Sequence, residues 1–241
     1  MRELYANEKY DLSYINYDRR KQTLASVYWE AEKEEKHFFD KEWAEIQADL
    51  EKKFKGYGPT IVSYDDARTR AIVWTGNDRA PAKYHLYDFK TGETRLAADP
   101  YPWLDEKQLS HVKPVTYRSR DGLEIHGYLT LPLGVDPKNL PVVINPHGGP
   151  WARDSWFFNP EVQFLANRGY AVLQMNFRGS TGYGKKFWEA SFKQWGKTMQ
   201  DDITDGVHWL ISEGIADEKR IAIYGGSYGG YATLAGHCLH P

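Results

Sequence analysis

The feature that most constrains this chain is a glycine-rich turn close to its C-terminal end. The apolar run at residues 221–224 leads directly into Gly225-Gly226-Ser227-Tyr228-Gly229-Gly230. A G-x-S-x-G sequence between a buried strand and a helix is typical of a sharp turn that presents a serine hydroxyl at the edge of a sheet. Such a turn strains the serine backbone, and a side chain at position 225 or 229 is expected to collide with its neighbours. We therefore predict that Ser227 is a nucleophile and that a helix begins directly after it.

A second glycine-rich segment follows the apolar run at residues 142–144 and has the sequence Asn145-Pro146-His147-Gly148-Gly149-Pro150. When a serine attacks a carbonyl group, the oxygen that becomes negative needs two N–H donors, one from the residue after the serine and one from such a loop. We expect these donors to be the N–H of Tyr228 and the N–H of Gly149 or, alternatively, of Gly148. His147 lies in the loop before the nucleophile, so we interpret it as a residue that shapes this loop.

A third segment, at residues 176–184, has the sequence Asn-Phe-Arg-Gly-Ser-Thr-Gly-Tyr-Gly. Its spacing matches neither the dinucleotide-binding pattern nor the P-loop, so we predict a rigid loop beside the active site and no cofactor. We expect Arg178 to anchor this loop through a buried ion pair with Asp202 or Asp205. Cys238 is the only cysteine, which excludes a disulfide within the chain and a cysteine-based metal site, and we predict no bound metal.

The second half of the chain alternates apolar runs with helical segments. The runs lie at residues 142–144, 170–175 and 221–224, and the helical segments lie at 162–166 and 203–210. Continuous apolar strands that alternate with helices imply a parallel sheet covered on both faces, so we assign this half to the α/β class. Before it, residues 115–118 and 123–131 are predicted to form a hairpin that turns at Asp121-Gly122.

The first hundred residues contain short strands and a weak internal repeat. Tyr17-Asp18 and Tyr64-Asp65 lie 47 residues apart, and each pair precedes an apolar run, at residues 24–29 and 71–74. Periods of about 40–50 residues with strand–turn–strand content are typical of β-propeller blades. Residues 85–88 and the turn at 90–92 predict the outer hairpin of the second copy.

One helix is predicted within this repeat. Asp40 can cap a helix whose apolar residues, spaced as one helical face, are Trp43, Ile46, Leu50 and Phe54. The opposite face is expected to be solvated and consists of Glu42, Glu45, Gln47, Asp49 and Lys52. We interpret this helix as an insertion that packs against one blade.

Composition excludes several classes of function. The formal net charge is −2, which gives no general attraction to nucleic acid or to anionic lipid. No apolar run approaches the roughly 20 residues that span a bilayer, and the charged N-terminus does not match a signal peptide. We therefore expect neither a nucleic-acid partner nor a membrane, and leave open a cytoplasmic or a periplasmic or secreted location. The aromatic content of 15% is typical of a chain with many short, aromatic-rich strands. The alternative explanation is a groove that binds carbohydrate or peptide.

The partners that a nucleophilic serine needs are not evident in the sequence. After a turn of this type, an Asp or Glu and then a His are expected further along the chain. Only 14 residues follow Ser227, and none of them is acidic. His237 lies roughly 15 Å along the predicted helix and His240 lies past it, whereas a general base must be within about 3 Å of the hydroxyl. We therefore expect the chain to be a fragment of a longer protein.

Taken together, the blade-like repeat and the motifs His-Gly-Gly-Pro, Asn-Phe-Arg-Gly-Ser-Thr-Gly-Tyr-Gly and Gly-Gly-Ser-Tyr-Gly-Gly resemble the prolyl oligopeptidase family of serine peptidases. The His-Gly-Gly-Pro form is most similar to its acylaminoacyl-peptidase and dipeptidyl-peptidase-like branches. The resemblance is specific over residues 113–241 and weaker over residues 1–112. It implies that residues 1–112 are the last blades of a β-propeller, with a helical insertion and a connector. Residues 113–241 would then be the N-terminal part of an α/β-hydrolase domain.

The same resemblance implies Ser227 as the nucleophile, and Gly149 with Tyr228 as the oxyanion donors. It also implies a propeller that restricts substrates to short peptides. Our first hypothesis is therefore a serine peptidase that forms an acyl-enzyme on Ser227, inactive in this chain because the acid and base are missing. The alternatives are a carboxylesterase or lipase on the same fold, and a non-catalytic interaction protein built on propeller blades.

Overall fold

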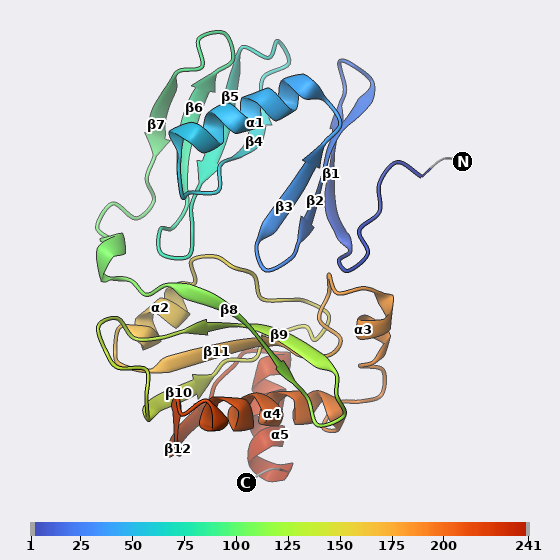
Figure 1. The fold of residues 1–241 in the computed structure, drawn as a ribbon. Coiled ribbons are helices and arrows are strands. Elements are labelled where there is room, and N and C mark those ends of the chain that lie inside the picture. Colours follow the sequence, from blue (N-terminus) through green and yellow to red (C-terminus); the bar gives the residue numbers. More distant parts are fainter. Residues whose placement is uncertain (1–2, 240–241) are drawn as a thin grey trace.

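The computed structural model describes residues 3–239, which form two parts, one above the other in Figure 1. The upper part holds two antiparallel sheets and one long helix. The first sheet, in the order β1-β2-β3, consists of β1 (Leu12–Asp18), β2 (Thr23–Glu30) and β3 (Glu34–Phe38). The second, in the order β4-β5-β6-β7, consists of β4 (Thr60–Tyr64), β5 (Arg70–Thr75), β6 (Lys83–Asp88) and β7 (Thr94–Ala98).

Each sheet has an aspartate at the turn that leads into its second strand, as the Tyr-Asp spacing predicts, although the two turns differ in length. Asp18 at the end of β1 and Asp65 directly after β4 each begin a turn into the next strand. The Asp18 carboxylate accepts hydrogen bonds from the backbone N–H groups of Arg20 (2.9 Å) and Lys21 (3.0 Å). Asp65 does the same for Thr69 and Arg70. An Asp that binds the backbone a few residues on closes a turn, so the repeated residue has a repeated role. Antiparallel sheets of this kind are consistent with propeller blades.

Helix α1 (Lys41–Lys53) lies between the two sheets in the chain and is capped as expected by Asp40, whose carboxylate accepts from the N–H of Trp43. Its apolar face packs on the second sheet, where Leu50 is fully buried in one cluster with Val73 and Tyr87. The prediction that Gln47 lies on the solvated face of this helix is wrong, because its side chain is buried. Its amide donates to the Pro59 carbonyl at 3.0 Å, and a buried amide is tolerated when it is hydrogen-bonded in this way.

The lower part is built on one five-stranded sheet in the order β12-β10-β11-β9-β8. Its strands are β8 (Val112–Arg118), β9 (Glu124–Thr130), β10 (Leu140–Ile144), β11 (Ala171–Asn176) and β12 (Ala216–Ile223). Its helices are α2 (Pro160–Ala166), α3 (Lys185–Glu189), α4 (Thr198–Ser212) and α5 (Tyr228–Leu239), and a short 3-10 turn, Glu106–Gln108, lies in the connector. No helix in the described range is long and apolar enough to cross a bilayer.

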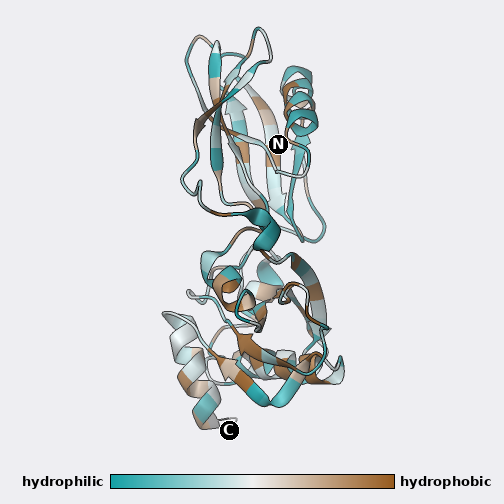
Figure 2. Ribbon diagram, turned by 90° about the vertical axis from the view of Figure 1, so that its left-hand side faces the viewer, coloured by the Kyte–Doolittle hydropathy of each residue, from teal (hydrophilic) through white to brown (hydrophobic). Residues whose placement is uncertain are grey.

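The sheet is mixed, which corrects the expectation of an entirely parallel one. Strands β10, β11 and β12 are parallel, but the predicted hairpin β8–β9 joins the same sheet and β9 pairs antiparallel with β11. Strand β11 is buried at every residue because α2 and α4 pack on its two faces (Figure 1). Figure 2 shows that hydrophobic segments gather in the strands of this lower sheet.

Strand β12 differs from the buried run predicted at residues 221–224. It pairs with β10 alone among the described strands, so it lies at one edge of the sheet. Its residues are partly exposed in consequence, and Tyr224, which follows it, is 52% exposed. Among the described residues, β12 therefore has one unpaired side.

Candidate active site

Ser227 lies on the turn between β12 and α5, at the end of the sheet where the parallel strands finish. Its φ is +56°, in the left-handed region that a residue with a side chain rarely adopts. Helix α5 begins at the next residue, Tyr228, and the Ser227 carbonyl accepts the N–H of Tyr231 at 3.0 Å. The first amides of the helix, which have no partner within it, therefore lie beside the serine.

Glycine is required on both sides of this turn because the backbone packs too closely for a side chain. A Cβ atom at Gly225 would lie 2.8 Å from the carbonyl oxygen of Pro146 and 2.9 Å from the backbone of Gly229. A Cβ at Gly229 would lie closer still to the same oxygen, whereas a Cβ at Gly226 would meet nothing within 4 Å. The predicted collisions at positions 225 and 229 are confirmed.

The loop after β10 is fastened to the nucleophile turn by hydrogen bonds. Tyr224 donates its N–H to the Ile144 carbonyl at 2.9 Å, and the Asn145 amide donates to the Tyr224 carbonyl at 2.9 Å. Gly148 then lies directly against Ser227, where an added Cβ would be 3.4 Å from the serine Cβ and 3.9 Å from its Oγ. The structure thus brings together Ser227 and the predicted oxyanion loop. Gly149 is the next residue of that loop and has a φ of +126°.

His147 is placed inside the loop. Its Nδ1 lies 2.7 Å from the Gly148 carbonyl oxygen and its Nε2 lies 2.8 Å from the Ser180 hydroxyl, while its ring stacks on Phe177 at 4.4 Å. Burial lowers the pKa of His147 to about 4, so the imidazole is neutral at pH 7. Because a carbonyl oxygen can only accept, Nδ1 carries the proton and Nε2 accepts from Ser180. Nδ1 is therefore engaged within the loop, and Nε2 lies against Ser180 of the third glycine-rich segment.

Arg178 anchors the third glycine-rich segment, and of the two partners proposed from the sequence it takes Asp202. The guanidinium and the backbone N–H of Arg178 make hydrogen bonds of 2.7–2.9 Å to the fully buried Asp202 carboxylate. A second ion pair, to Asp121 at 2.7 Å, comes from the β8–β9 turn and was missed. Asp205 instead pairs with Arg120. A buried ion pair is tolerated when the remaining hydrogen-bonding groups of its two side chains are satisfied. Neither Arg178 nor Asp202 has a buried side-chain atom without a hydrogen-bond partner.

Tyr228, the other expected oxyanion donor, is the first residue of α5, and its side chain is buried. Its ring packs against Phe177 at 5.2 Å and against Trp195 at 4.9 Å, which holds the start of the helix in place. His237 is exposed, ten residues beyond Ser227 in the same helix, and His240 lies outside the described residues. Within residues 3–239 no cluster of three or more His, Cys, Asp or Glu side chains could hold a metal ion.

Arg153, which was not predicted from the sequence, links the two parts of the structure. Its guanidinium donates to the backbone carbonyls of Glu30 (2.8 Å) and Ala31 (3.1 Å) and lies over the ring of Tyr183 at 4.5 Å. Lys33 adds a second contact of this kind, with its ammonium group 3.7 Å from the centre of a Trp156 ring. The one hint in the sequence is the charged pair Arg153-Asp154, which begins three residues after the glycine-rich loop ends at Pro150.

Asp154, next to Arg153, is an incompletely paired carboxylate. Its Oδ1 accepts from the Gln174 amide at 2.9 Å, but its Oδ2 is inaccessible to solvent and has no hydrogen-bond partner. Burial of the charged form raises the pKa of Asp154 to about 7. This carboxyl group is therefore largely protonated below neutral pH.

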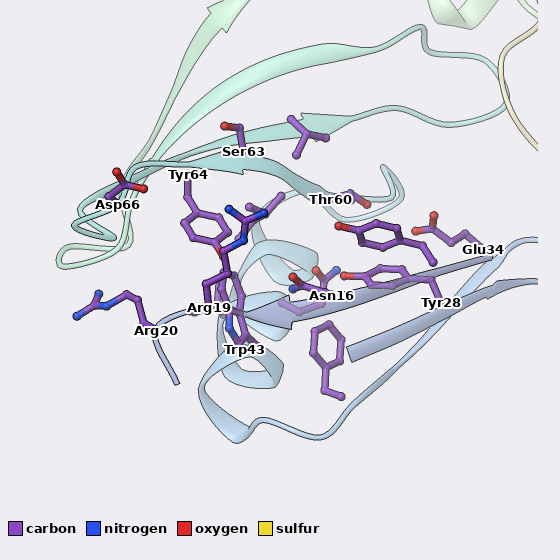
Figure 3. Close-up of a pocket in the computed structure, with 16 residues that line it drawn as sticks. Asn16, Arg19, Arg20, Tyr28, Glu34, Trp43, Thr60, Ser63, Tyr64 and Asp66 are labelled. Carbon is purple, nitrogen blue, oxygen red and sulfur yellow. The ribbon is translucent and has the colours of Figure 1, made fainter. Parts of the chain in front are cut away.

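A separate pocket of about 440 Å³ lies in the upper part, between the two sheets. Figure 3 shows Asn16 and Tyr28 on one side and Thr60 and Tyr64 on the other. All of its lining residues fall within residues 14–66, so it shares no residue with the Ser227 turn or the oxyanion loop.

Comparison with known proteins agrees with this geometry. The model of the prolyl oligopeptidase family matches residues 156–238. Dipeptidyl aminopeptidase BIII of Pseudoxanthomonas mexicana is 42% identical over 207 residues, which cover 81% of this chain and 30% of that protein. The chain belongs to the prolyl oligopeptidase family of serine peptidases. Dipeptidyl peptidase family member 6 of Caenorhabditis elegans, another relative in the family, is 36% identical over 73% of this chain and 26% of its own length.

Solved structures of the family give the same result. An acylaminoacyl peptidase of Pyrococcus horikoshii aligns with a TM-score of 0.66 and 25% identity, over 95% of this chain and 35% of the other. A puromycin-hydrolysing peptidase of Mycobacterium tuberculosis aligns with a TM-score of 0.62 and 31% identity, over 69% of this chain and 27% of the other. The chain thus spans about a third or less of the length of these prolyl oligopeptidase relatives.

The packing around the turn predicts a sharp difference between two adjacent glycines. Gly225→Ala places a methyl group against the Pro146 carbonyl and is expected to destabilise the protein by about 1–3 kcal/mol, as overpacking does. Gly226→Ala enters open space and should change stability by less than about 0.5 kcal/mol. Denaturant unfolding of both variants measures the difference, and equal stabilities would contradict the packing described here.

The raised pKa of Asp154 predicts a pH-dependent stability. Between about pH 4 and pH 7 the folded chain holds a proton that the unfolded chain has lost, so this group reduces stability progressively as the pH rises through that window. Asp154→Asn removes the ionisation and should stabilise the protein by on the order of 1–3 kcal/mol at pH 8, and by much less at pH 4. Unfolding curves at both pH values test this, with the exposed Asp136→Asn as the control. A gain of equal size at both pH values would refute it.

Proposed function

We propose that this chain supplies the nucleophile and the oxyanion hole of a serine peptidase that hydrolyses peptide bonds of short peptides. The observation that carries the proposal is the contact of the Gly148 backbone with Ser227, at a serine held in the left-handed conformation. An exposed serine between this loop and the start of a helix suits attack on a planar carbonyl group.

The proposed reaction has two halves. In the first, Oγ of Ser227 bonds to the carbonyl carbon while the π electron pair moves onto the oxygen, which accepts hydrogen bonds from the N–H groups of Gly149 and Tyr228. The hydroxyl proton passes to a general base and then to the leaving amine as the C–N bond breaks, which leaves an acyl-enzyme. In the second half, water attacks the ester in the same way and regenerates the hydroxyl group.

The general base and its carboxylate are proposed to lie in a longer polypeptide that contains these residues. Two observations support this. The relatives are about three times as long as the region they share with this chain, and in folds of this type the acid and the histidine follow the nucleophile. His147 is unsuited to the role because both ring nitrogens lie against other partners, the Gly148 carbonyl and the Ser180 hydroxyl.

Two features support peptides as the substrates. The relatives are named as dipeptidyl aminopeptidases, dipeptidyl peptidases and acylaminoacyl peptidases. The loop that follows Gly149 also contacts the upper part through Arg153 and Trp156, so the blade-like sheets lie next to the oxyanion loop. A cover in that position would limit access to short, flexible chains.

Labelling with a fluorophosphonate tests the nucleophile. In the full-length polypeptide, Oγ of Ser227 should bond to phosphorus and displace fluoride, so that the wild type is labelled and Ser227→Ala is not. The exposed Ser212, in the last turn of α4, gives a matched control, since Ser212→Ala should label as the wild type does. A folded wild-type protein that is not labelled by the fluorophosphonate would contradict the hydrolase proposal and favour a non-catalytic interaction protein.

Turnover tests the placement of the acid and base. We expect the 241-residue chain alone to hydrolyse neither a dipeptidyl nitroanilide nor a nitrophenyl ester above a Ser227→Ala control, because the general base is proposed to lie in the longer polypeptide. The full-length polypeptide should cleave the anilide efficiently. Activity in the short chain would contradict this expectation, and a marked preference for esters would favour a carboxylesterase.

A further inference from the structure

Another pocket, of about 530 Å³, lies at the junction of the two parts of the structure. The upper part contributes the β2–β3 hairpin, the segment at the end of α1 and the end of β5, and the lower part contributes Ser155, Trp156 and Phe157. None of the described residues that line it belongs to the Ser227 turn or to the oxyanion loop at residues 145–150. Its volume is in the range of small-molecule sites, which is roughly 300–1,000 Å³.

Aromatic rings form much of the wall of this junction pocket. Trp74 and Phe157 come from different parts of the structure, and their rings lie 4.9 Å apart at an interplanar angle of 32°. Gly76 allows this approach, since a Cβ atom at that position would lie 2.8 Å from the Phe157 ring. Phe54 and Tyr57 line the pocket from the segment after α1, and both are partly exposed. Rings that are partly open to solvent around a cavity are suited to pack against another ring.

One ammonium group in the junction pocket has few partners. The side chain of Lys36 is 15% exposed, and among the described residues its Nζ makes one long hydrogen bond, of 3.4 Å, to the Pro59 carbonyl. The Glu34 carboxylate lies 3.8 Å away, which is within reach of an ion pair but too far for a hydrogen bond. Burial lowers the pKa of Lys36 and raises that of Glu34, so neither charge fully compensates the other. An ammonium group has three N–H donors, and Lys36 can therefore take a further acceptor.

The junction pocket carries both signs of charge in equal number. Its acidic residues are Glu30, Glu34 and Glu51, and its basic residues are Lys33, Lys36 and Lys55. A ligand with a single charge would meet like charge as well as opposite charge, whereas a ligand with both charges can pair with each. Glu34 and Lys36 lie two residues apart in β3, so their side chains are on the same face of the strand. A ligand that pairs with both needs its own two charges close together.

We propose that the junction pocket binds a free aromatic α-amino acid. The carboxylate of the amino acid accepts hydrogen bonds from Lys36, its ammonium group pairs with Glu34, and its ring lies among the aromatic side chains of the wall. The two charged groups of an α-amino acid are attached to one carbon atom, which matches two neighbouring side chains on one strand face, whereas the two ends of a dipeptide are farther apart. Binding breaks and forms no covalent bond, and it does not depend on the reaction proposed for Ser227.

A ligand in this position contacts both parts of the structure at once. Trp156 and Phe157 lie in the segment that follows the oxyanion loop, while Glu34 and Lys36 belong to the upper part. Lys33 already joins the two parts here, through its ammonium group over a Trp156 ring. The amino acid adds a second connection across the same junction. Hydrolysis of peptides, the proposed function, releases compounds of this chemical class.

Isothermal titration calorimetry of the full-length polypeptide with L-phenylalanine tests the proposal. We expect a dissociation constant of about 1 mM or lower, as is usual for a ligand of this size. L-phenylalaninamide lacks the carboxylate and phenylpropionate lacks the ammonium group, so each should bind at least about tenfold more weakly. L-alanine, which lacks the ring, should not bind detectably. Ser227→Ala should bind L-phenylalanine as the wild type does, so that binding and hydrolysis can fail separately.

Two substitutions in β3 locate the ligand. Lys36→Met keeps an unbranched side chain but removes the ammonium group, and should weaken the binding of L-phenylalanine at least about tenfold. Glu34→Gln replaces a half-exposed carboxylate by an amide, so the protein should fold normally and bind L-phenylalanine and phenylpropionate with similar affinity. Lys90→Met, at an exposed lysine of the upper part, is the matched control and should bind as the wild type does.

Three results would each overturn the proposal. The first is a wild-type protein that does not bind L-phenylalanine, and the second is a Lys36→Met protein that binds it with unchanged affinity. The third is a wild-type protein that binds phenylpropionate as tightly as the amino acid, since the ammonium group would then have no partner in the pocket.

Discussion

The candidate site depends on how closely two backbone segments approach at the ends of β10 and β12. The carbonyl oxygen of Pro146 lies against Gly225 and Gly229 at distances that no Cβ atom would allow. That approach places the loop after β10 beside the start of α5, and with it Gly148 beside Ser227. The left-handed conformation of Ser227 follows from the same geometry, since the chain must reverse from strand to helix within a few residues. The absence of side chains at Gly225 and Gly229 makes this approach possible, and the amide of the neighbouring Asn145 supports it by donating to the Tyr224 carbonyl.

A contact made mainly of backbone atoms is weakly specified unless its surroundings are rigid. The surrounding groups here are buried and polar, and they bond to one another. Arg178 holds the carboxylate of Asp202, Ser180 holds His147, and the imidazole holds the Gly148 carbonyl. Burying such groups is unfavourable when they are left unpaired, so the arrangement in which they all find partners is strongly preferred over its alternatives. The polar network thus selects one conformation for a loop that its glycines leave free.

The parts of this structure that the sequence could predict are those set by near neighbours in the chain. Asp40 as a helix cap, the hairpin at Asp121-Gly122 and the glycines at 225 and 229 follow from local conformational rules. Gln47 was misplaced because its helical position is polar by residue type, while its burial depends on the Pro59 carbonyl of a later segment. The antiparallel attachment of β9 to β11 is likewise a property of strand order, which apolar runs do not encode.

Arg153 shows why the junction between the two parts was the hardest feature to foresee. It binds backbone carbonyls of Glu30 and Ala31, and a backbone acceptor is present at every residue whatever its type. No complementary charge marks the position in the sequence. The contact of Arg153 with the upper sheets also restrains the loop that precedes it. The loop of residues 146–153 is held at one end by the glycine contact at Pro146 and at the other by Arg153, so Gly148 and Gly149 lie on a segment that connects the Ser227 turn with the upper sheets. A displacement of those sheets would therefore act on the loop at Arg153. The restraint nearest to that point along the loop is the hydrogen bond that the Ala152 carbonyl accepts from the N–H of Thr181 at 2.9 Å.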